Sequence, residues 1–347
     1  MKKPTVFGLF VAAVVGVAMP FLAAPAQAQG NLVLYCTVQE EWCRPMVEAF
    51  ERQTGIKVAM TRKSSGEFYA QLKAEASNPR GDIWWGGTGD PHLQAAEEGL
   101  TESYTSSLNG QLQDWALRQW QQSKQRTVGV YAGALGYSYN TEQLKRKGGA
   151  APKCWADLTD PRFKDEVQVA DPNASGTSYT MLATIIQLMG EDKAWDYYKS
   201  IHKNINQYTK SGAAPAKAVS TGESLIGITF QHDAVIFALQ GAPVAIVSPC
   251  EGTGYEVGSM SIVKGARNME NAKKWYDWAL SVDAQSIGPK AGVSYQVPSN
   301  KGSFVPEKAP KLSEIKLIDY NFAKYGSSAE RKRLLAKWDN DIKNLPK

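Results

Sequence analysis

Four short clusters of serine, threonine and glycine come at points where an apolar run gives way to a helical pattern. They are Ser64-Ser65-Gly66, Gly87-Thr88-Gly89, Ser175-Gly176-Thr177-Ser178 and Ser211-Gly212. Free backbone NH groups at a helix start bind phosphate with the help of the helix dipole, and hydroxyl groups add donors that rotate to suit the anion. For any one cluster, a residue that only caps its own helix is the simpler explanation. Four clusters in one chain favour a dianion held by several of them together.

A second group of polar residues has the chemistry to bind hydroxyl groups. His232 and Asp233 follow the apolar run LIGITF, and the segment EGTGYEV adds Glu251 and Glu256. Neighbouring donors and acceptors of this kind suit the vicinal hydroxyls of a sugar. The alternatives are a helix cap by Asp233 with His232 exposed, and an ordinary surface loop for the glutamates.

The segment GDIWWGGTGDPH places two tryptophans directly before two glycines. Trp84 and Trp85 must point to opposite faces of a strand, so we expect one in the core and the other on the wall of a cleft. Gly86 and Gly87 would let the backbone approach a ligand, and Thr88 would supply a hydroxyl and an NH group to it.

The common signatures of catalysis are missing from the chain. It has no G-x-S-x-G, H-E-x-x-H, P-loop or G-x-G-x-x-G motif, and only three histidines, His92, His202 and His232. We therefore expect no catalytic residue, no metal site and no cofactor; a secreted phosphatase is the alternative from the enzyme class. The formal net charge of +5 is spread without a dominant basic run, which gives no support to nucleic-acid binding.

The elements that would position these residues alternate between strand and helix. Strand patterns at 31–36, 56–62 and 81–87 are interleaved with helical patterns at 45–55, 64–79 and 90–99. This order predicts an α/β fold with a mostly parallel sheet, in which loops at the carboxyl ends of the strands border the ligand crevice. A β-rich run covers 127–140, two strand-like runs surround a short helix within 223–249, and the tail from 312 is helical and charged.

The first 28 residues have the pattern of a cleavable signal peptide. Lys2-Lys3 precede an apolar run that ends at the cleavage site Ala26-Gln27-Ala28, which predicts export to the periplasm. Four cysteines in an exported chain favour two disulfides. Cys36 and Cys43 form a plausible local pair, which leaves Cys154 with Cys250, although four cysteines allow three connectivities.

The chain resembles the periplasmic solute-binding proteins of ABC importers, in the ferric-ion-binding branch and closest to its hexose-phosphate relatives. The resemblance rests on NPRGDIWWGGTGDPHLQAAEEGL, ALGYSYNTEQL and the block from WADLTDP to SGTSY. It implies a type II, two-lobed Venus-flytrap fold in which each lobe is a mostly parallel sheet flanked by helices and a two-strand hinge joins the lobes. We expect 29–133 and 258–347 in the first lobe and 134–257 in the second.

The resemblance also implies the ligand and the residues that hold it. Ferric-binding members place two adjacent tyrosines after the strand that here reads LIGITF, whereas this chain has Gln231-His232-Asp233. That difference disfavours iron and indicates a hexose phosphate, with a phosphonate such as 2-aminoethylphosphonate as the second choice and ferric iron as the third. The expected partner is an inner-membrane ABC permease, and the protein is expected to be a monomer. We expect the phosphate at Ser64, Ser65, Gly66, Thr88, Ser175, Gly176, Thr177 and Ser211, and the sugar at Thr37, His232, Asp233 and Glu256.

Overall fold

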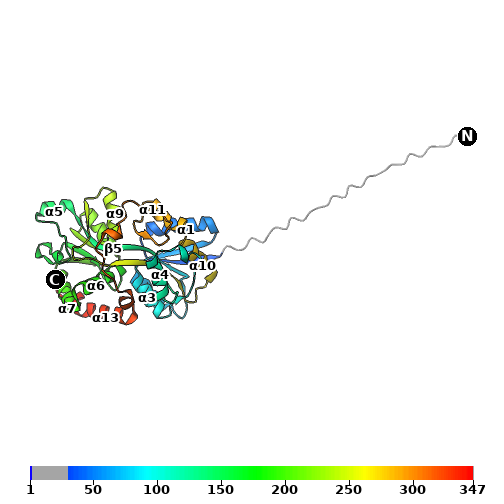
Figure 1. Ribbon diagram of the computed structural model, residues 1–347, viewed down its shortest axis with the longest axis horizontal. Coiled ribbons are helices and arrows are strands. Elements are labelled where there is room, and N and C mark those ends of the chain that lie inside the picture. The colour runs from blue at the N-terminus through cyan, green and yellow to red at the C-terminus, as the bar shows by residue number, and fades with distance from the viewer. Residues whose placement is uncertain (2–29, 347) are drawn as a thin grey trace.

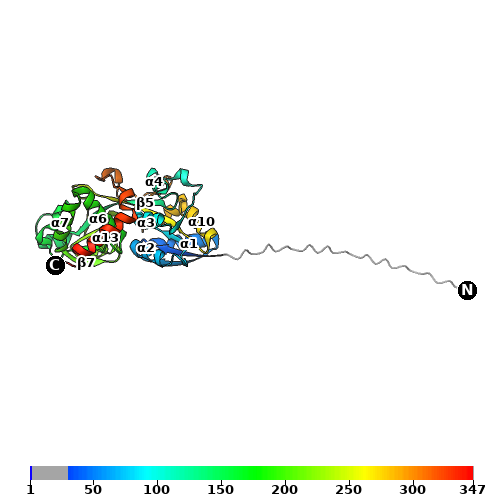
Figure 2. The same cartoon turned by 90° about the horizontal axis from the view of Figure 1, so that it is seen from below.

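The computed structural model describes Met1 and residues 30–346, so the expected signal peptide lies almost entirely outside the described residues. Two lobes lie side by side, and strand β5 runs from one into the other (Figures 1 and 2). Within the part of the chain that the structure describes, no helix combines the length and the apolar character that a membrane crossing requires.

The first lobe is built on a sheet with helices on both faces. Strand β1 lies between β2 and β3 and is parallel to both, while β10 is antiparallel to β3. Along β1, Leu32 and Leu34 pack into one apolar cluster and Tyr35 into another on the opposite face. The strands are β1 (Asn31–Cys36), β2 (Lys57–Arg62), β3 (Ile83–Trp85), β4 (Thr101–Glu102) and β10 (Tyr255–Val263), and the helices are α1 (Glu40–Thr54), α2 (Ser65–Ala74), α3 (Gly89–Glu97), α4 (Asp114–Gln122), α10 (Met269–Ala279) and α11 (Val282–Lys290).

The second lobe repeats this plan with a smaller sheet. Strand β6 lies between β7 and β8 and is parallel to both, and β9 pairs antiparallel with β5. The strands are β6 (Val167–Ala170), β7 (Ile205–Thr209), β8 (Ile226–Phe230) and β9 (Val244–Val247), and the helices are α5 (Thr141–Lys147), α6 (Gly176–Met189), α7 (Glu191–His202), α8 (Ala214–Thr221) and α9 (Gln231–Leu239).

Two long strands join the lobes. Strand β5 (Val128–Asn140) pairs with β10 along residues 128–134 and with β8 along residues 135–139, so one strand belongs to both sheets. Strand β10 carries the chain back into the first lobe, where β11 (Val297–Pro298) also pairs with β5. This arrangement confirms the predicted fold of two α/β lobes joined by a two-strand hinge.

The C-terminal tail packs against the second lobe. Tyr320, Leu334 and Trp338 belong to the hydrophobic cluster that also contains the core residues of α6 and α7. The tail contains helices α12 (Phe322–Tyr325) and α13 (Ser328–Trp338), and α13 lies on the lower edge of the molecule in Figure 1. We therefore propose that the chain from Ile318 onward moves with the second lobe, in place of the expected assignment of 258–347 to the first. The amphipathic pattern predicts a buried helix face but does not say which lobe covers it.

Both expected disulfides are present. Cys36 is bonded to Cys43 and ties the end of β1 to α1, while Cys154 is bonded to Cys250 across a sequence separation of 96 residues.

Candidate ligand-binding site

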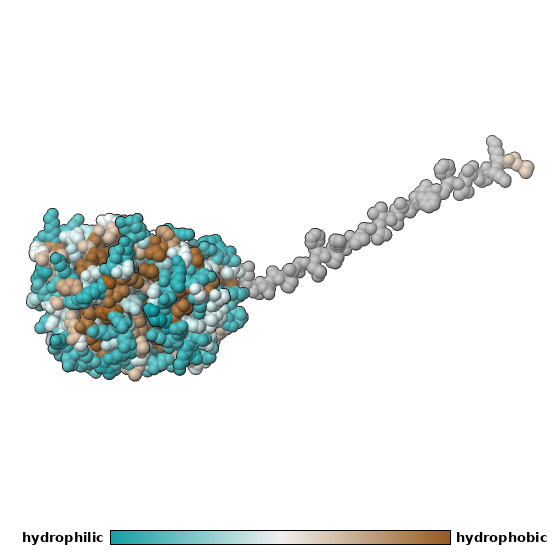
Figure 3. All heavy atoms as spheres, viewed as in Figure 1, coloured by the Kyte–Doolittle hydropathy of each residue, from teal (hydrophilic) through white to brown (hydrophobic). Residues whose placement is uncertain are grey.

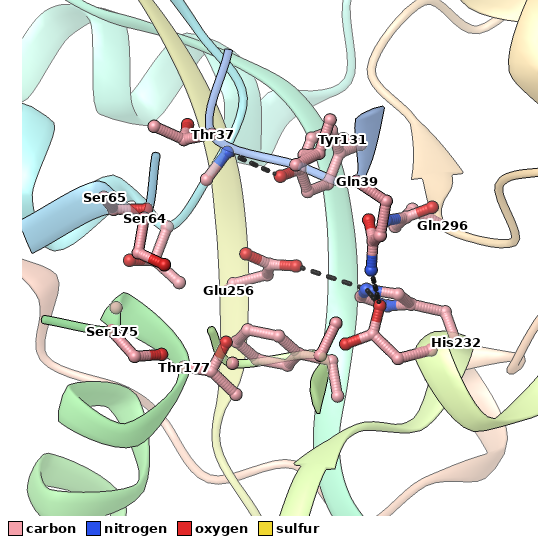
Figure 4. Close-up of a pocket in the computed structure, with 18 of the residues that line it drawn as sticks. Thr37, Gln39, Ser64, Ser65, Tyr131, Ser175, Thr177, His232, Glu256 and Gln296 are labelled. Atoms are coloured by element: carbon pink, nitrogen blue, oxygen red, sulfur yellow. Dashed lines mark hydrogen bonds and ion pairs between the residues drawn. The ribbon is translucent and has the colours of Figure 1, made fainter. Parts of the chain in front are cut away.

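A cavity lies between the two lobes and collects most of the predicted ligand residues (Figure 4). Hydrogen bonds across the cleft hold the lobes together around it. Ser64 Oγ donates to Lys210 O at 2.9 Å, and Gln39 Nε2 donates to Asp233 Oδ1. Ten of the twelve predicted residues line the cavity: Thr37, Ser64, Ser65, Thr88, Ser175, Gly176, Thr177, His232, Asp233 and Glu256.

The other two predicted residues lie at the edge of the cleft. The Gly66 NH donates to Ala174 O at 3.0 Å, so this glycine joins the lobes and does not line the cavity. Ser211 Oγ accepts a hydrogen bond from Arg62 Nη2 at 3.3 Å. Both residues therefore contribute to closure of the cleft.

Helix starts from both lobes meet at one end of the cavity. Ser64, Thr88 and Ser175 occupy the N-cap positions of α2, α3 and α6. Ser64 is partly used as a helix cap, because its backbone NH donates a hydrogen bond to Glu67 Oε2 at 3.0 Å within a capping box. Thr88 and Ser175 make no side-chain cap bond. Their hydroxyl groups are thus not needed for the helices that they precede.

Thr88 carries the clearest sign of a ligand at this end. Its side chain is 2% exposed, and Oγ1 has no hydrogen-bond partner. A buried hydroxyl without a partner costs about 1–3 kcal/mol. Among the serines and threonines that line the cavity, Thr88 is the one with such a hydroxyl. An anion bound at the starts of α3 and α6 would accept a hydrogen bond from this hydroxyl.

Close packing at this end depends on glycine. Gly87 has φ +77°, and an added Cβ would overlap Ser65 Oγ and Thr37 Oγ1. A Cβ on Gly176 would overlap Thr88 Oγ1 from the opposite lobe. These two glycines let hydroxyl groups from the two lobes approach one another.

The tryptophans do not wall the cleft as expected. Trp84 is fully buried, stacks on His92 with ring centroids 3.6 Å apart, and donates from Nε1 to Thr37 Oγ1 at 3.3 Å. Trp85 is 3% exposed and packs edge-on against Trp42. The expectation for a cleft-facing tryptophan was wrong because helices cover both faces of this sheet, so both alternating positions of the strand are core positions.

The opposite end of the cavity holds three buried side chains with oxygen or nitrogen atoms. His232 Nε2 lies 3.6 Å from Asp233 Oδ1 and 3.6 Å from Glu256 Oε1, and all three residues are less than 5% exposed. Asp233 also accepts from Thr229 Oγ1 at 2.8 Å. The alternative in which His232 is exposed was therefore wrong. Glu251 lies elsewhere, since it accepts from the backbone NH groups of Trp155 and Ala156.

Burial sets the protonation of this end. It lowers the pKa of His232, against the opposing effect of the Asp233 charge. It also raises the pKa of Glu256 well above its usual value, and the negative charges of Asp233 and Asp90 add to the effect. His232 Nδ1 has no hydrogen-bond partner. A neutral imidazole and a protonated carboxyl each offer one donor and one acceptor, which suits uncharged hydroxyl groups.

Several lining residues were missed by the sequence analysis. Arg62 is the one lining residue with a permanent positive charge. It is the last residue of β2, two positions before Ser64, so its place at the carboxyl end of a strand was a usable signal. Tyr131 Oη accepts a hydrogen bond from the Gly87 NH at 2.8 Å. Gln39 and Gln296 also reach the cavity (Figure 4), and nothing in their local sequence indicates a binding role.

A buried acidic residue connects the site to the C-terminal tail. Asp90 lies in the first turn of α3, and Tyr320 Oη donates to its Oδ2 at 3.3 Å. Burial raises the pKa of Asp90 to about 6, although the charge of Arg331 opposes the shift. This contact links the helix that presents Thr88 to the segment that packs on the second lobe.

The family model for bacterial extracellular solute-binding proteins matches residues 88–325. The chain belongs to this family. An uncharacterized protein of Haemophilus influenzae is 44% identical over 324 residues, which cover 93% of each chain. The structure of the periplasmic binding protein AfuA from Actinobacillus pleuropneumoniae, with exogenous fructose-6-phosphate bound, is 45% identical and has a TM-score of 0.87; the match covers 92% of this chain and all of AfuA. Iron-bound HitA from Pseudomonas aeruginosa shares the fold at 19% identity and a TM-score of 0.73, with 88% of this chain and 98% of HitA covered.

This solute-binding protein does not bring a tyrosine pair to its cleft. Tyr197 and Tyr198 are adjacent in sequence, but both are buried in the core of the second lobe. Tyr131 is the tyrosine among the residues that line the cavity. The pair of hard anionic phenolate ligands expected for a ferric-binding relative is therefore not assembled among the residues that line the cavity.

Proposed function

We propose that this protein is the periplasmic receptor of an ABC importer that captures a hexose phosphate between its lobes and delivers it to an inner-membrane permease. Solute-binding proteins of this family bind a small ligand for import, and the relatives are periplasmic. The signal peptide predicted at residues 1–28 would direct this chain to the same compartment as a soluble monomer. The proposal goes further in naming the chemical class of the ligand.

The unpartnered hydroxyl of Thr88 carries the phosphate part of the proposal. It is buried at a point where the N-termini of α3 and α6 converge, with the hydroxyls of Ser65 and Thr177 nearby and Arg62 as a cation. Such a site offers many donors and few acceptors, which is the requirement of a phosphate dianion.

The sugar part of the proposal rests on the two-ended shape of the cavity. Figure 4 shows Ser64, Ser65, Ser175 and Thr177 grouped on one side, His232, Gln39 and Gln296 on the other, and Glu256 between them. At the second end, a neutral His232 and a protonated Glu256 offer donors and acceptors to hydroxyl groups, and the carboxylate of Asp233 adds acceptors for them. The fructose-6-phosphate in the related AfuA structure is a ligand with the same two ends.

The proposal is tested by identifying what the purified protein binds. Native mass spectrometry of the exported protein would be followed by thermal-shift titration with glucose 6-phosphate, fructose 6-phosphate, 2-aminoethylphosphonate, inorganic phosphate and ferric citrate. A ligand that prefers the folded state raises the unfolding midpoint by mass action. We expect a shift with the hexose phosphates that exceeds the shift with inorganic phosphate. A shift with 2-aminoethylphosphonate alone or ferric citrate alone would contradict the proposal.

A further inference from the structure

Tyr131 is a buried tyrosine of the hinge that lines the ligand cavity. It lies on β5 opposite Gly258 of β10, and a Cβ on that glycine would overlap the tyrosine ring. In the next pair on the same face of the two strands, Gly133 lies opposite Glu256, and a Cβ on Gly133 would overlap the ring of His232. The two glycines therefore make room for Tyr131 and for the His232–Glu256 pair on one face of the hinge.

The Tyr131 hydroxyl has one function in use and one that is free. Its oxygen accepts a hydrogen bond from the Gly87 NH at 2.8 Å, but among the residues that the structure describes its own proton has no acceptor. Burial raises the pKa of Tyr131 well above its usual value, and the negative charge of Glu256 adds to the effect, so the proton stays on the oxygen. A buried O–H group that can only donate is thus available to an acceptor in the cavity.

The position of this donor is between the two ends of the site. Its partner Gly87 directly precedes Thr88, which belongs to the anion end, whereas Glu256 belongs to the other end. Figure 4 shows Tyr131 above Glu256, with Ser64 to one side and His232 to the other. The lobes meet as one continuous surface on the face shown in Figure 3, and Tyr131 is only 3% exposed, so in this closed form little bulk water reaches the proton.

The direction of the Gly87 NH is fixed from the other side of the same peptide. The Gly86–Gly87 peptide is trans, so its C=O and N–H bonds point in opposite directions. Gly86 O accepts a hydrogen bond from Thr37 Oγ1 and lies 3.1 Å from His92 Nε2. With the carbonyl held by these two side chains, the Gly87 NH is directed away from them and toward Tyr131.

His92 can make this contact in one way only. It is fully buried, it does not line the cavity, and its Nδ1 lies 2.8 Å from Ser261 Oγ. Burial lowers the pKa of His92 to about 3, so the imidazole is neutral and carries a single N–H group. Because a carbonyl oxygen only accepts, this N–H group is at Nε2 and donates to Gly86 O, while Nδ1 accepts from Ser261.

Resting on the proposed function, we infer that the Tyr131 hydroxyl donates a hydrogen bond to an oxygen of the bound hexose phosphate, and that His92 is a positioning residue that directs this hydroxyl through the Gly86–Gly87 peptide. Tyr131 touches the ligand. His92 acts only through the peptide, because it lies outside the cavity.

Isothermal titration of Tyr131→Phe with glucose 6-phosphate and fructose 6-phosphate tests the ligand contact. We expect the hexose phosphate that the wild type binds to be weakened about tenfold, through loss of one hydrogen bond. Tyr137→Phe is the matched control, because Tyr137 is also buried on β5 and donates from its hydroxyl to Cys154 O, but does not line the cavity. Each substitution removes one buried hydrogen bond, so a loss of affinity confined to Tyr131→Phe does not come from lower stability.

The outcomes separate the inference from the proposed function. If the wild type binds a hexose phosphate and Tyr131→Phe binds it equally well, the inference is overturned while the proposed function stands. If Tyr137→Phe weakens the ligand as much as Tyr131→Phe does, the contact is also refuted. If the wild type binds no hexose phosphate, the proposed function itself fails.

A double-mutant cycle tests the positioning role of His92. His92→Leu should weaken the hexose phosphate several-fold in the wild type and have little further effect in Tyr131→Phe, because the residue that it directs has already lost its hydroxyl. His92→Gln, which keeps an N–H donor on a side chain of similar reach, should restore part of the affinity. An equal loss from His92→Leu in both backgrounds would show a purely structural role and overturn the positioning.

The tautomer of His92 gives a measurement that needs no variant. In the nitrogen NMR spectrum of wild-type protein labelled with ¹⁵N-histidine, we expect His92 to carry its proton on Nε2. A proton on Nδ1 would remove the donor to Gly86 O and overturn the positioning role, even if His92→Leu does not fold.

Discussion

Replacing Thr88 with valine separates a ligand contact from a structural role. The substitution keeps the shape of the side chain and exchanges the hydroxyl for a methyl group. Because Oγ1 has no partner in the protein, the unliganded fold loses no hydrogen bond. Removal of a buried unpaired hydroxyl is neutral or relieves up to about 1 kcal/mol, so the unfolding midpoint should stay constant or rise by a few degrees.

Ligand affinity should move in the opposite direction. A hydrogen bond to a charged phosphate contributes about 1.5–3 kcal/mol, so its loss raises the dissociation constant for hexose phosphates roughly 10- to 150-fold. Isothermal titration measures the affinity, and calorimetric unfolding of the ligand-free protein measures the stability. Inorganic phosphate should be weakened along with the hexose phosphates, because the lost contact is to the phosphate.

Thr184→Val is the matched control for this experiment. Thr184 Oγ1 is also buried without a partner, on α6, but it does not line the cavity. We expect the same small effect on stability and no effect on affinity. If Thr88→Val lowers the free energy of unfolding and leaves the affinity intact, Thr88 is a helix cap and the phosphate assignment is refuted.

Four further predictions concern both ends of the site and the fold around them. Asp233→Ala should weaken hexose phosphates by about 1–3 kcal/mol and leave inorganic phosphate unchanged in titration; an equal loss for both would place Asp233 outside the sugar end. Gly176→Ala should block closure, because the new Cβ overlaps a hydroxyl of the opposite lobe, and small-angle scattering with ligand should then show the open form instead of the compact one. Loss of the Cys154–Cys250 disulfide should lower the free energy of unfolding by about 5 kcal/mol, about twice the effect of the short-range disulfide, since it closes the longer loop; equal effects in denaturant unfolding would contradict this. Burial raises the pKa of Asp90 from 3.8 to about 6 in the folded protein, so the ionised carboxylate destabilises the fold. This effect is absent below pH 3.8 and grows until the pH reaches 6, so the stability of Asp90→Asn relative to the wild type should increase by about 3 kcal/mol between pH 3.5 and 7. A stability difference that does not change with pH would show that the site does not disfavour the ionised carboxylate.

Local patterns in the sequence were enough to predict the elements and the general position of the site. Alternating apolar residues and helix-start signals identified most strands and helices, because strand faces and helix caps depend on residues close together in the chain. Even so, α1 begins at Glu40 and not at Pro45, since the Cys36–Cys43 bond and buried Trp42 stabilise an earlier turn. Serine and threonine clusters at the carboxyl ends of strands lead into one crevice in any doubly wound sheet, which is why they predicted lining residues from both lobes.

The amino-acid sequence by itself determined the α/β class and the residue types available to bind an anion and a sugar. It favoured one cysteine pairing without fixing it, because four cysteines allow three connectivities. Only the tertiary structure decided that Trp85 is a core residue, that the C-terminal tail covers the second lobe, and that Arg62 and Gln39 reach across the cleft. These features depend on contacts between segments far apart in the chain. Hydrophobic periodicity and capping residues indicate only the local secondary structure. The packing of helices on the sheets and of the two lobes on each other determines which face of a sheet is buried and which residues meet across the closed cleft.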